Sequence, residues 1–324
     1  MRRRLVAVAA PLGKLLGVVL LVSFLTFCLT KLLPGDPVTG ILGSEASNPE
    51  AAAALREDLG LDEPFLEQYV SYVHGVVTDF DLGRAYSSGF EVSDLIANRL
   101  PATLELILLA QVIALLIAVP LALFSAYRAE SPADRAISAG AFGLISVPTF
   151  AMAVVLVYVF AIQLGWVPAV GYDRITGPGG VSANLRSVAL PVTVLVAGLA
   201  AVYTRVLRSD LIATLQEDFI LMARSKGLPT WHLLVRHALR PSSLSLLTVF
   251  GINFGALIGG SVIVEHFFSI PGLGQMAIES IAKRDYLAVQ GVVLVVAVAF
   301  VLVNFAVDLL YAVLDPRVRR APAR

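Results

Sequence analysis

The sequence predicts an all-α integral membrane protein with six transmembrane helices. Hydrophobic residues make up 57% of its 324 residues and charged residues only 15%, whereas a soluble domain carries about 25% charged residues. Apolar runs recur along the chain, and about 20 helical residues are needed to cross 30 Å of hydrocarbon. Helices are favoured because each one satisfies its own backbone polar groups in lipid.

The first apolar run covers residues 15–30 and follows three arginines at positions 2–4. Such a segment fits either a secretory signal peptide or an uncleaved membrane helix. No small-x-small cleavage site follows the run before Pro34. We therefore interpret residues 1–33 as a cytoplasmic N-terminus and a first transmembrane helix.

Residues 34–99 form a polar and acidic segment, with 12 Asp and Glu against 3 Arg. Short helices are expected at residues 51–59 and 67–77. A segment of this size has too little core to be stable alone, so we expect it to pack on the membrane helices.

Residues 100–324 are predicted to form a five-helix core. The apolar runs lie between residues 99 and 128 and at 136–163, 187–204, 241–264 and 286–307. Each is long enough to span a bilayer. The run 136–163 contains Pro148 but no charged residue.

The distribution of Lys and Arg predicts the orientation of these helices. With the N-terminus in the cytoplasm, the inside segments hold 16 basic residues and the outside segments hold 8. This bias follows the positive-inside rule. It places both termini in the cytoplasm and the acidic segment 34–99 outside.

A polar island at residues 216–241 interrupts the apolar pattern, within a predicted cytoplasmic loop at 205–241. Its charged residues are acidic first and basic later, as a helix dipole favours: Glu217, Asp218, Arg224, Lys226, Arg236 and Arg240. Gly227 fits the position that ends a helix, and Pro229 fits the first turn of the next. We therefore predict two short helices joined at residues 227–229.

The first of these short helices carries an apolar stripe formed by Phe219, Met222 and Ala223. Residues at i, i+3 and i+4 share one helix face. The stripe is available to a partner protein, or it belongs to a solvated loop helix that packs against its own chain.

Few residues indicate chemistry. The chain has no GxxxxGK[ST] motif, so a P-loop nucleotide site of its own is excluded. Its single cysteine, Cys28, cannot form an internal disulfide, and His232 and His237 are five residues apart. That spacing does not suit a metal pair on an α-helix. We expect no catalytic residue and no metal site in this chain.

Polar and small residues within the predicted spans leave two interpretations open. Glu105 is either a functional intramembrane carboxylate or an interfacial group six residues from Arg99. Gly251, Gly255 and Gly259 recur every four residues, and such a strip serves helix packing or lines a pathway. Asn253 in the same run is compatible with both roles.

The chain resembles the permease subunits of bacterial ABC importers, in the dipeptide, oligopeptide and nickel branch. The resemblance covers nearly the whole length. It rests on these ordered segments: LLPGDP (32–37), LGLDEP (59–64), DLGRAY (81–86), ISVPTF (145–150), ARSKGL (223–228), RHALRPS (236–242), FFSIPGLG (267–274), RDY (284–286), VQG (289–291) and DPRVR (315–319).

The resemblance implies a type I importer permease fold and a coupling loop that docks on a separate ATPase. In the family this loop carries the EAA motif, in which Ala223, Gly227 and Leu239 match the second Ala, the Gly and the Leu. Leu221, Met222, His237 and Arg240 depart from the pattern. The residues assigned to coupling are Glu217, Phe219, Met222, Ala223, Arg224, Lys226, Gly227 and Leu239.

The resemblance also implies the partners. They are a second homologous permease subunit, two cytoplasmic ATPase subunits that bind ATP and Mg²⁺, and an extracytoplasmic solute-binding protein, all at a bacterial inner membrane. The cargo stays open among dipeptides, longer peptides, nickel and other small solutes.

Two other classes of membrane protein would leave different signals in the sequence. An ion-coupled secondary transporter would show discontinuous or charged helices near the midplane, often in repeats, and a membrane-anchored enzyme would show clustered ligands. Neither feature is clear in this sequence.

Overall fold

We describe the protein from a computed structural model, which places residues 17–28, 38, 42, 48–58 and 62–314. Within these ranges the chain is helical and has no strand beyond one isolated bridge between Arg84 and Glu91. The all-α prediction is confirmed. The segments divide into two compact units: residues 1–103 with 271–301, and residues 104–270 with 302–324.

The first unit contains helix Gly17–Cys28, α3 (Pro49–Asp58), α4 (Phe65–Thr78) and α12 (Leu273–Ala282), with the beginnings of α5 and α13. The expected short helices 51–59 and 67–77 correspond to α3 and α4. Phe24 and Phe27 pack their rings against Phe65 and Tyr69 of α4, at centroid distances of 5.2–6.1 Å. Aromatic contacts of this kind favour edge-to-face geometry.

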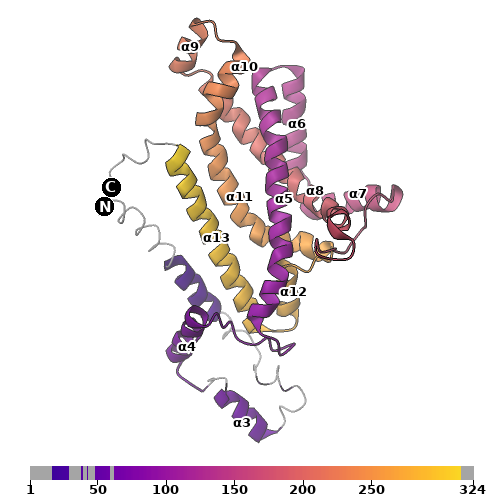
Figure 1. The fold of residues 1–324 in the computed structure, drawn as a ribbon, viewed down its shortest axis with the longest axis vertical. Coiled ribbons are helices and arrows are strands. Elements are labelled where there is room, and N and C mark those ends of the chain that lie inside the picture. Colours follow the sequence, from indigo (N-terminus) through magenta and orange to yellow (C-terminus); the bar gives the residue numbers. More distant parts are fainter. Residues whose placement is uncertain (1–16, 29–37, 39–41, 43–47, 59–61, 315–324) are drawn as a thin grey trace, which may run out of the picture. The chain divides into compact units, whose positions relative to one another are not determined.

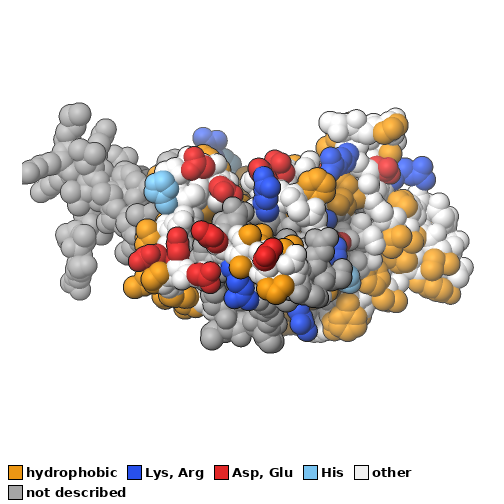
Figure 2. All heavy atoms as spheres, turned by 90° about the horizontal axis from the view of Figure 1, so that it is seen from below, with side chains coloured by type: hydrophobic (Ala, Val, Ile, Leu, Met, Phe, Trp, Pro, Cys, Tyr) orange, Lys and Arg blue, Asp and Glu red, His pale blue; other side chains and the backbone are white. Residues whose placement is uncertain are grey.

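The loop between α4 and α5 is held in the first unit by a shared apolar core. Leu82 and Ala85 of this loop pack with Val92 of α5, Leu273 of α12 and Val292 of α13. This part of the acidic segment thus shares its apolar core with α12 and α13, in line with the expectation that the segment packs on the membrane helices. Seen from the α3 and α4 end, several carboxylates lie close together on the exposed face (Figure 2).

Polar contacts fix the same loop and α12. The carboxylate of Asp285, buried before α13, accepts hydrogen bonds from the backbone N–H and the hydroxyl of Ser87 at 2.9 and 2.8 Å. Arg99 pairs with Glu279 at 3.1 Å. Residues 271–301 thus pack with the N-terminal third of the chain, which the sequence did not indicate.

The second unit holds most of the long helices (Figure 1). Its elements are α5 from residue 104 on, α6 (Pro132–Ser146), α7 (Thr149–Leu156), the π-helix η2 (Val157–Gln163), α8 (Gly180–Thr214), α9 (Asp218–Ser225), α10 (Thr230–His232), the π-helix η3 (Leu233–Ala238), α11 (Leu239–Phe267) and the end of α13 (Tyr286–Leu314). Helix α8 contacts α6, α7 and α11, and many of its apolar residues are buried.

Among the residues that the structure describes, four helices are long and apolar enough to cross a membrane by themselves: Val92–Tyr127, Gly180–Thr214, Thr230–Phe267 and Tyr286–Val307. They correspond to four of the six predicted spans. The first predicted span, residues 15–30, is described only over Gly17–Cys28, and its ends lie outside the described residues.

The predicted run 136–163 is a bent pair of helices instead of one continuous helix. The chain bends by 102° between helices Pro132–Ser146 and Thr149–Gln163. Val147 and Pro148 between them are extended, with ψ of 122° and 142°. A proline disfavours the helical region for the residue before it and has no N–H to donate. The break at Pro148 therefore has a local cause.

Candidate functional site

The polar island folds as a short helix with a tight turn on either side. After α8 ends at Thr214, Glu217 is extended (φ −70°, ψ 148°) and α9 begins at Asp218. The acidic residue in the first turn and Arg224 in the last turn suit the helix dipole. Gly227 has a φ of +83°, a left-handed conformation that glycine adopts without steric cost. The predicted end of this helix is therefore confirmed.

The second short helix predicted after Gly227 is not separate. Helix α10 continues through η3 into α11 and forms one apolar helix, Thr230–Phe267. The π-helical turn of residues 233–238 lies directly before Pro241. Because this proline cannot donate to the preceding turn, the wider π turn accommodates it without ending the helix.

The π-helical turn also changes the relation between His232 and His237. Their ring centroids lie 5.8 Å apart, because residues five apart are neighbours in an i→i+5 helix. The α-helical spacing used to set this pair aside therefore does not apply in the π turn, and the expectation that the chain has no metal site stays a prediction. The described residues contain no group of three or more His, Cys, Asp or Glu placed to hold a metal ion.

One face of α9 is exposed and apolar. The exposed fractions of Phe219, Leu221 and Met222 are 48%, 49% and 63%, and Trp231 after the turn is 52% exposed. Glu217, Arg224 and Lys226 are exposed around them, and Ala223 is half-buried. Exposed apolar residues that are rimmed by charge are typical of a protein–protein contact.

The opposite face of α9 is anchored. Ile220 is fully buried, as are Leu233 and Leu234 of η3, and α9 contacts η3. Thr214 and Ser242 share a hydrogen bond of 3.0 Å between α8 and α11. Leu239 is half-buried in α11 and so is not part of the exposed apolar face. The coupling residues thus separate into an exposed group on α9 and the turn, and one residue in the supporting helix.

A buried carboxylate lies at the same end of this unit, in the first turn of α6. Asp134 is 2% exposed and accepts two hydrogen bonds of 2.6 Å from Arg208 of α8. It also accepts from the hydroxyl of Ser125 and from the N–H of Glu130. Sequence reasoning did not single out this group. The only local signal was Ser131, which caps the N–H of Asp134.

The residues of α11 that were predicted to serve packing or the pathway lie in different surroundings: Gly251, Asn253, Gly255 and Gly259. Gly251 and Gly255 are buried, and an added Cβ at Gly251 would meet Val307 of α13 at 3.0 Å. Gly259 is exposed and has open space around its Cβ position. Asn253 is half-buried and donates to the carbonyl of Val249 at 2.9 Å. Gly251 therefore makes a close packing contact within the chain, and Gly259 does not.

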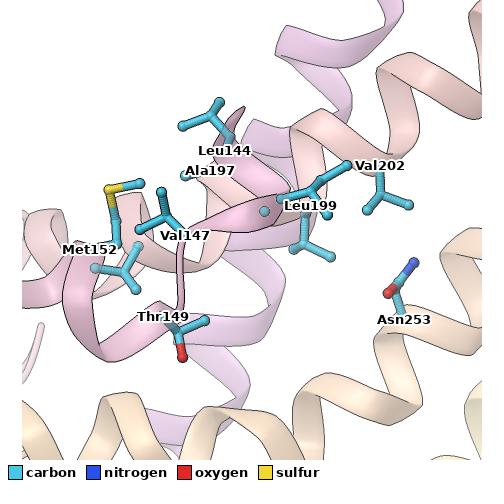
Figure 3. Close-up of a pocket in the computed structure, with 11 residues that line it drawn as sticks. Leu144, Val147, Thr149, Met152, Ala197, Leu199, Val202 and Asn253 are labelled. Carbon is cyan, nitrogen blue, oxygen red and sulfur yellow. The ribbon is translucent and has the colours of Figure 1, made fainter. Parts of the chain in front are cut away.

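A cavity of about 170 Å³ lies beside Asn253. It is lined by the bend around Pro148, by α8 and by α11, mostly with apolar side chains: Leu144, Ile145, Val147, Thr149, Met152, Val194, Ala197, Gly198, Leu199, Val202 and Asn253. In Figure 3 the Asn253 amide points from α11 into the space bordered by Leu199 and Val202 of α8. The broken span thus forms one wall of the cavity.

Glu105 has a defined partner. Its carboxylate accepts a hydrogen bond of 2.6 Å from the Tyr172 hydroxyl. Burial and this contact raise the pKa of Tyr172 above its ordinary value. One Glu105 oxygen is buried without a hydrogen bond. Glu105 therefore anchors the loop before α8, and a role in transport stays a prediction.

The family model described as "binding-protein-dependent transport system inner membrane component" matches residues 118–320. The model of its N-terminal region matches residues 7–107. The chain belongs to this family. It is therefore a permease subunit of a binding-protein-dependent ABC importer. This membership favours the ABC importer over the ion-coupled transporter.

Named relatives of this permease agree. A peptide transport system permease protein of Brucella abortus is 40% identical over 303 residues, 93% of this chain and 95% of the relative. A glutathione transport system permease protein of Escherichia coli is 35% identical over 309 residues, 94% of this chain and 97% of the relative. The family relation thus covers almost the whole permease.

A solved structure supports the fold. The inward-facing MetNI methionine ABC transporter has a chain that matches with a TM-score of 0.57 at 16% identity, over 68% of this permease and 96% of that chain. The permease is a multi-pass membrane protein with the type I importer fold.

Proposed function

We propose that this permease forms one half of a translocation pathway for peptides or similar small solutes. A second homologous permease subunit supplies the other half. The peptide cargo is supported by the relatives, which are named for peptide and glutathione transport. Nickel is the competing cargo from the same branch of importers.

Docking of the ATPase is assigned to α9 and the Gly227 turn. The observation that carries this assignment is the exposed apolar face of Phe219, Leu221 and Met222 on a helix whose other face is anchored by the buried Ile220. A rigidly seated apolar helix fits a groove on a partner. The basic residues Arg224 and Lys226 border this face and favour an acidic rim on that groove.

The orientation follows from the distribution of basic residues. Both termini and α9 are assigned to the cytoplasm, and residues 34–99 are assigned to the outer side, where a solute-binding protein delivers the cargo. The carboxylates of the acidic segment (Figure 2) would then face this protein.

ATP binding and hydrolysis are assigned to the partner subunits. Two cytoplasmic ATPase subunits bind ATP and Mg²⁺, and this chain contributes no catalytic residue. Closure of the ATPase pair shifts the permeases between outward-open and inward-open states, a two-state transition biased by nucleotide. The cavity beside Asn253 is assigned to the pathway, because it borders the bend at Pro148, where a small helix movement changes its width.

The docking assignment is tested with Met222→Asp in the assembled transporter. A charge in the centre of the α9 face is expected to weaken ATPase binding by about 10-fold or more, as loss of an interface hot spot does. The matched control is Leu66→Asp on α4, where the leucine is similarly exposed at 67%. Wild-type recovery of the ATPase with purified Met222→Asp would remove α9 from the interface.

The cargo is tested by uptake in a strain that lacks this permease. We expect loss of uptake of labelled di- and tripeptides and its return when the gene is supplied again. If nickel uptake depends on the permease and peptide uptake does not, the peptide assignment is wrong and the importer assignment stands.

A further inference from the structure

The contact between Asp134 and Arg208 ties two helices together with defined geometry. The Nε and Nη2 atoms of Arg208 each donate to a different oxygen of Asp134 at 2.6 Å. Nε also lies 3.1 Å from the Ser125 hydroxyl at the end of α5. A two-pronged contact of a guanidinium with a carboxylate fixes angle as well as distance. The ends of α5, α6 and α8 are thereby held in one register.

A second contact joins α6 and α8, three residues before Arg208 on α8 and eight residues after Asp134 on α6. The guanidinium of Arg205 on α8 lies 4.7 Å from the centroid of the Phe142 ring on α6. Two consecutive contacts between α6 and α8 resist rotation of one helix about the other. A single contact would act as a pivot.

Removal from water reduces the stability that this ion pair adds. Side-chain exposure is 2% for Asp134 and 26% for Arg208. The cost of removing such charges from water largely offsets their attraction, and apolar replacements are often as stable. What the two-pronged geometry supplies is a fixed orientation between the ends of α6 and α8.

The helices that carry the pair lead to α9 in one direction and to the cavity in the other. Arg208 lies six residues before the end of α8, which leads through a short turn into α9. In Figure 1 the turn between α5 and α6 lies at the same end of this unit as α9. In the other direction, α6 leads to the bend at Pro148, and α8 lines the cavity beside it.

We propose that Asp134 and Arg208 are positioning residues that lock α6 to α8, so that movement of α9 reaches the bent span and its cavity. This inference rests on the proposed coupling role of α9. α6 also packs on α8, so without the ion pair α6 follows the movement of α8 less closely. Less solute is then imported for each ATP hydrolysed. The pair acts through helix geometry and contacts neither nucleotide nor solute.

The test uses the complete transporter in proteoliposomes, with both permeases, the ATPase subunits and the solute-loaded binding protein. The quantity measured is solute imported per ATP hydrolysed. For Arg208→Gln we expect this ratio to fall by about 10-fold, within the range of allosteric coupling energies, while the ATPase still co-purifies. Arg135→Gln is the matched control, since it removes an exposed charge beside Asp134.

Arg208→Lys separates geometry from charge. Lysine retains the charge opposite Asp134 and lacks the planar fork. If the pair positions the helices, Arg208→Lys also imports less solute per ATP hydrolysed. If the pair only compensates charge, Arg208→Lys keeps the wild-type ratio. If Arg208→Gln does not accumulate in the membrane, the ratio measured for Arg208→Lys alone tests the proposal.

Two results would overturn the proposal. One is a wild-type ratio of import to hydrolysis in Arg208→Lys. The other is an equal loss of import and hydrolysis per assembled complex, which is the signature of a purely structural role. Failure of the coupling assignment itself looks different, because Met222→Asp would then retain the ATPase.

Discussion

Tyr127, the last residue of α5, packs edge-on against Trp231 of α10, with ring centroids 6.0 Å apart and planes at 89°. The contact joins α5 to the residues directly after the Gly227 turn. It is separate from the apolar contact between α9 and η3. The residues around the Gly227 turn are therefore held by an apolar contact of α9 with η3 and by an aromatic contact of α10 with α5.

The aromatic contact predicts a measurable interaction energy. In a double-mutant cycle of Tyr127→Leu and Trp231→Leu, the interaction is expected to contribute about 0.5–1.5 kcal/mol to stability. Thermal unfolding of the purified transporter measures it. Trp231→Phe is the control that retains an aromatic partner. Additive effects of the two leucine variants would show that the rings do not interact.

Gly227 predicts a graded series. Its φ of +83° strains other residues, and no atom lies within 4 Å of its Cβ position, so the penalty is conformational and not steric. A left-handed residue other than glycine costs about 1–2 kcal/mol, and asparagine tolerates this region better. We expect transport to fall in the order Gly227, Gly227→Asn, Gly227→Leu, with each variant present in the membrane. Solute uptake measures the series, and normal uptake by Gly227→Leu would falsify the lever role of this turn.

The glycine strip of α11 predicts opposite results at its two ends. Gly251→Leu forces a side chain against Val307, and overpacking of this kind costs about 1–3 kcal/mol. Gly259→Leu meets open space within the chain. We expect a lower unfolding temperature for the first variant only, with partial recovery in Gly251→Leu combined with Val307→Ala. Equal destabilisation by both variants would contradict this division of the strip.

Much of this fold could be predicted from the sequence, because its causes are local. Membrane spans follow from the length of apolar runs, and α9 with its turn follows from the order of charges and from Gly227. The bend at Pro148 also had a local signal, since a proline within a span weakens the helix at that point. The direction of the bend depends on packing against α8. The apolar pattern of residues 136–163 does not predict it.

The remaining features depend on distant parts of the chain. Asp134 and Arg208 are 74 residues apart, and nothing near either residue indicates the other. The same is true of Ser87 and Asp285, 198 residues apart. The neighbouring rings of His232 and His237 arise from a π-helical turn, which α-helical periodicity does not predict. Tertiary pairing and irregular helix geometry therefore account for most of what was missed.

The central claim is that α9 lies in the cytoplasm and is covered by the ATPase. It is tested by labelling Met222→Cys with a membrane-impermeant maleimide, in a Cys28→Ser background that has no other cysteine. The account predicts labelling in inside-out vesicles stripped of the ATPase, protection when the ATPase is added back, and no labelling of intact cells. Labelling in intact cells, or in inside-out vesicles regardless of the ATPase, would contradict it.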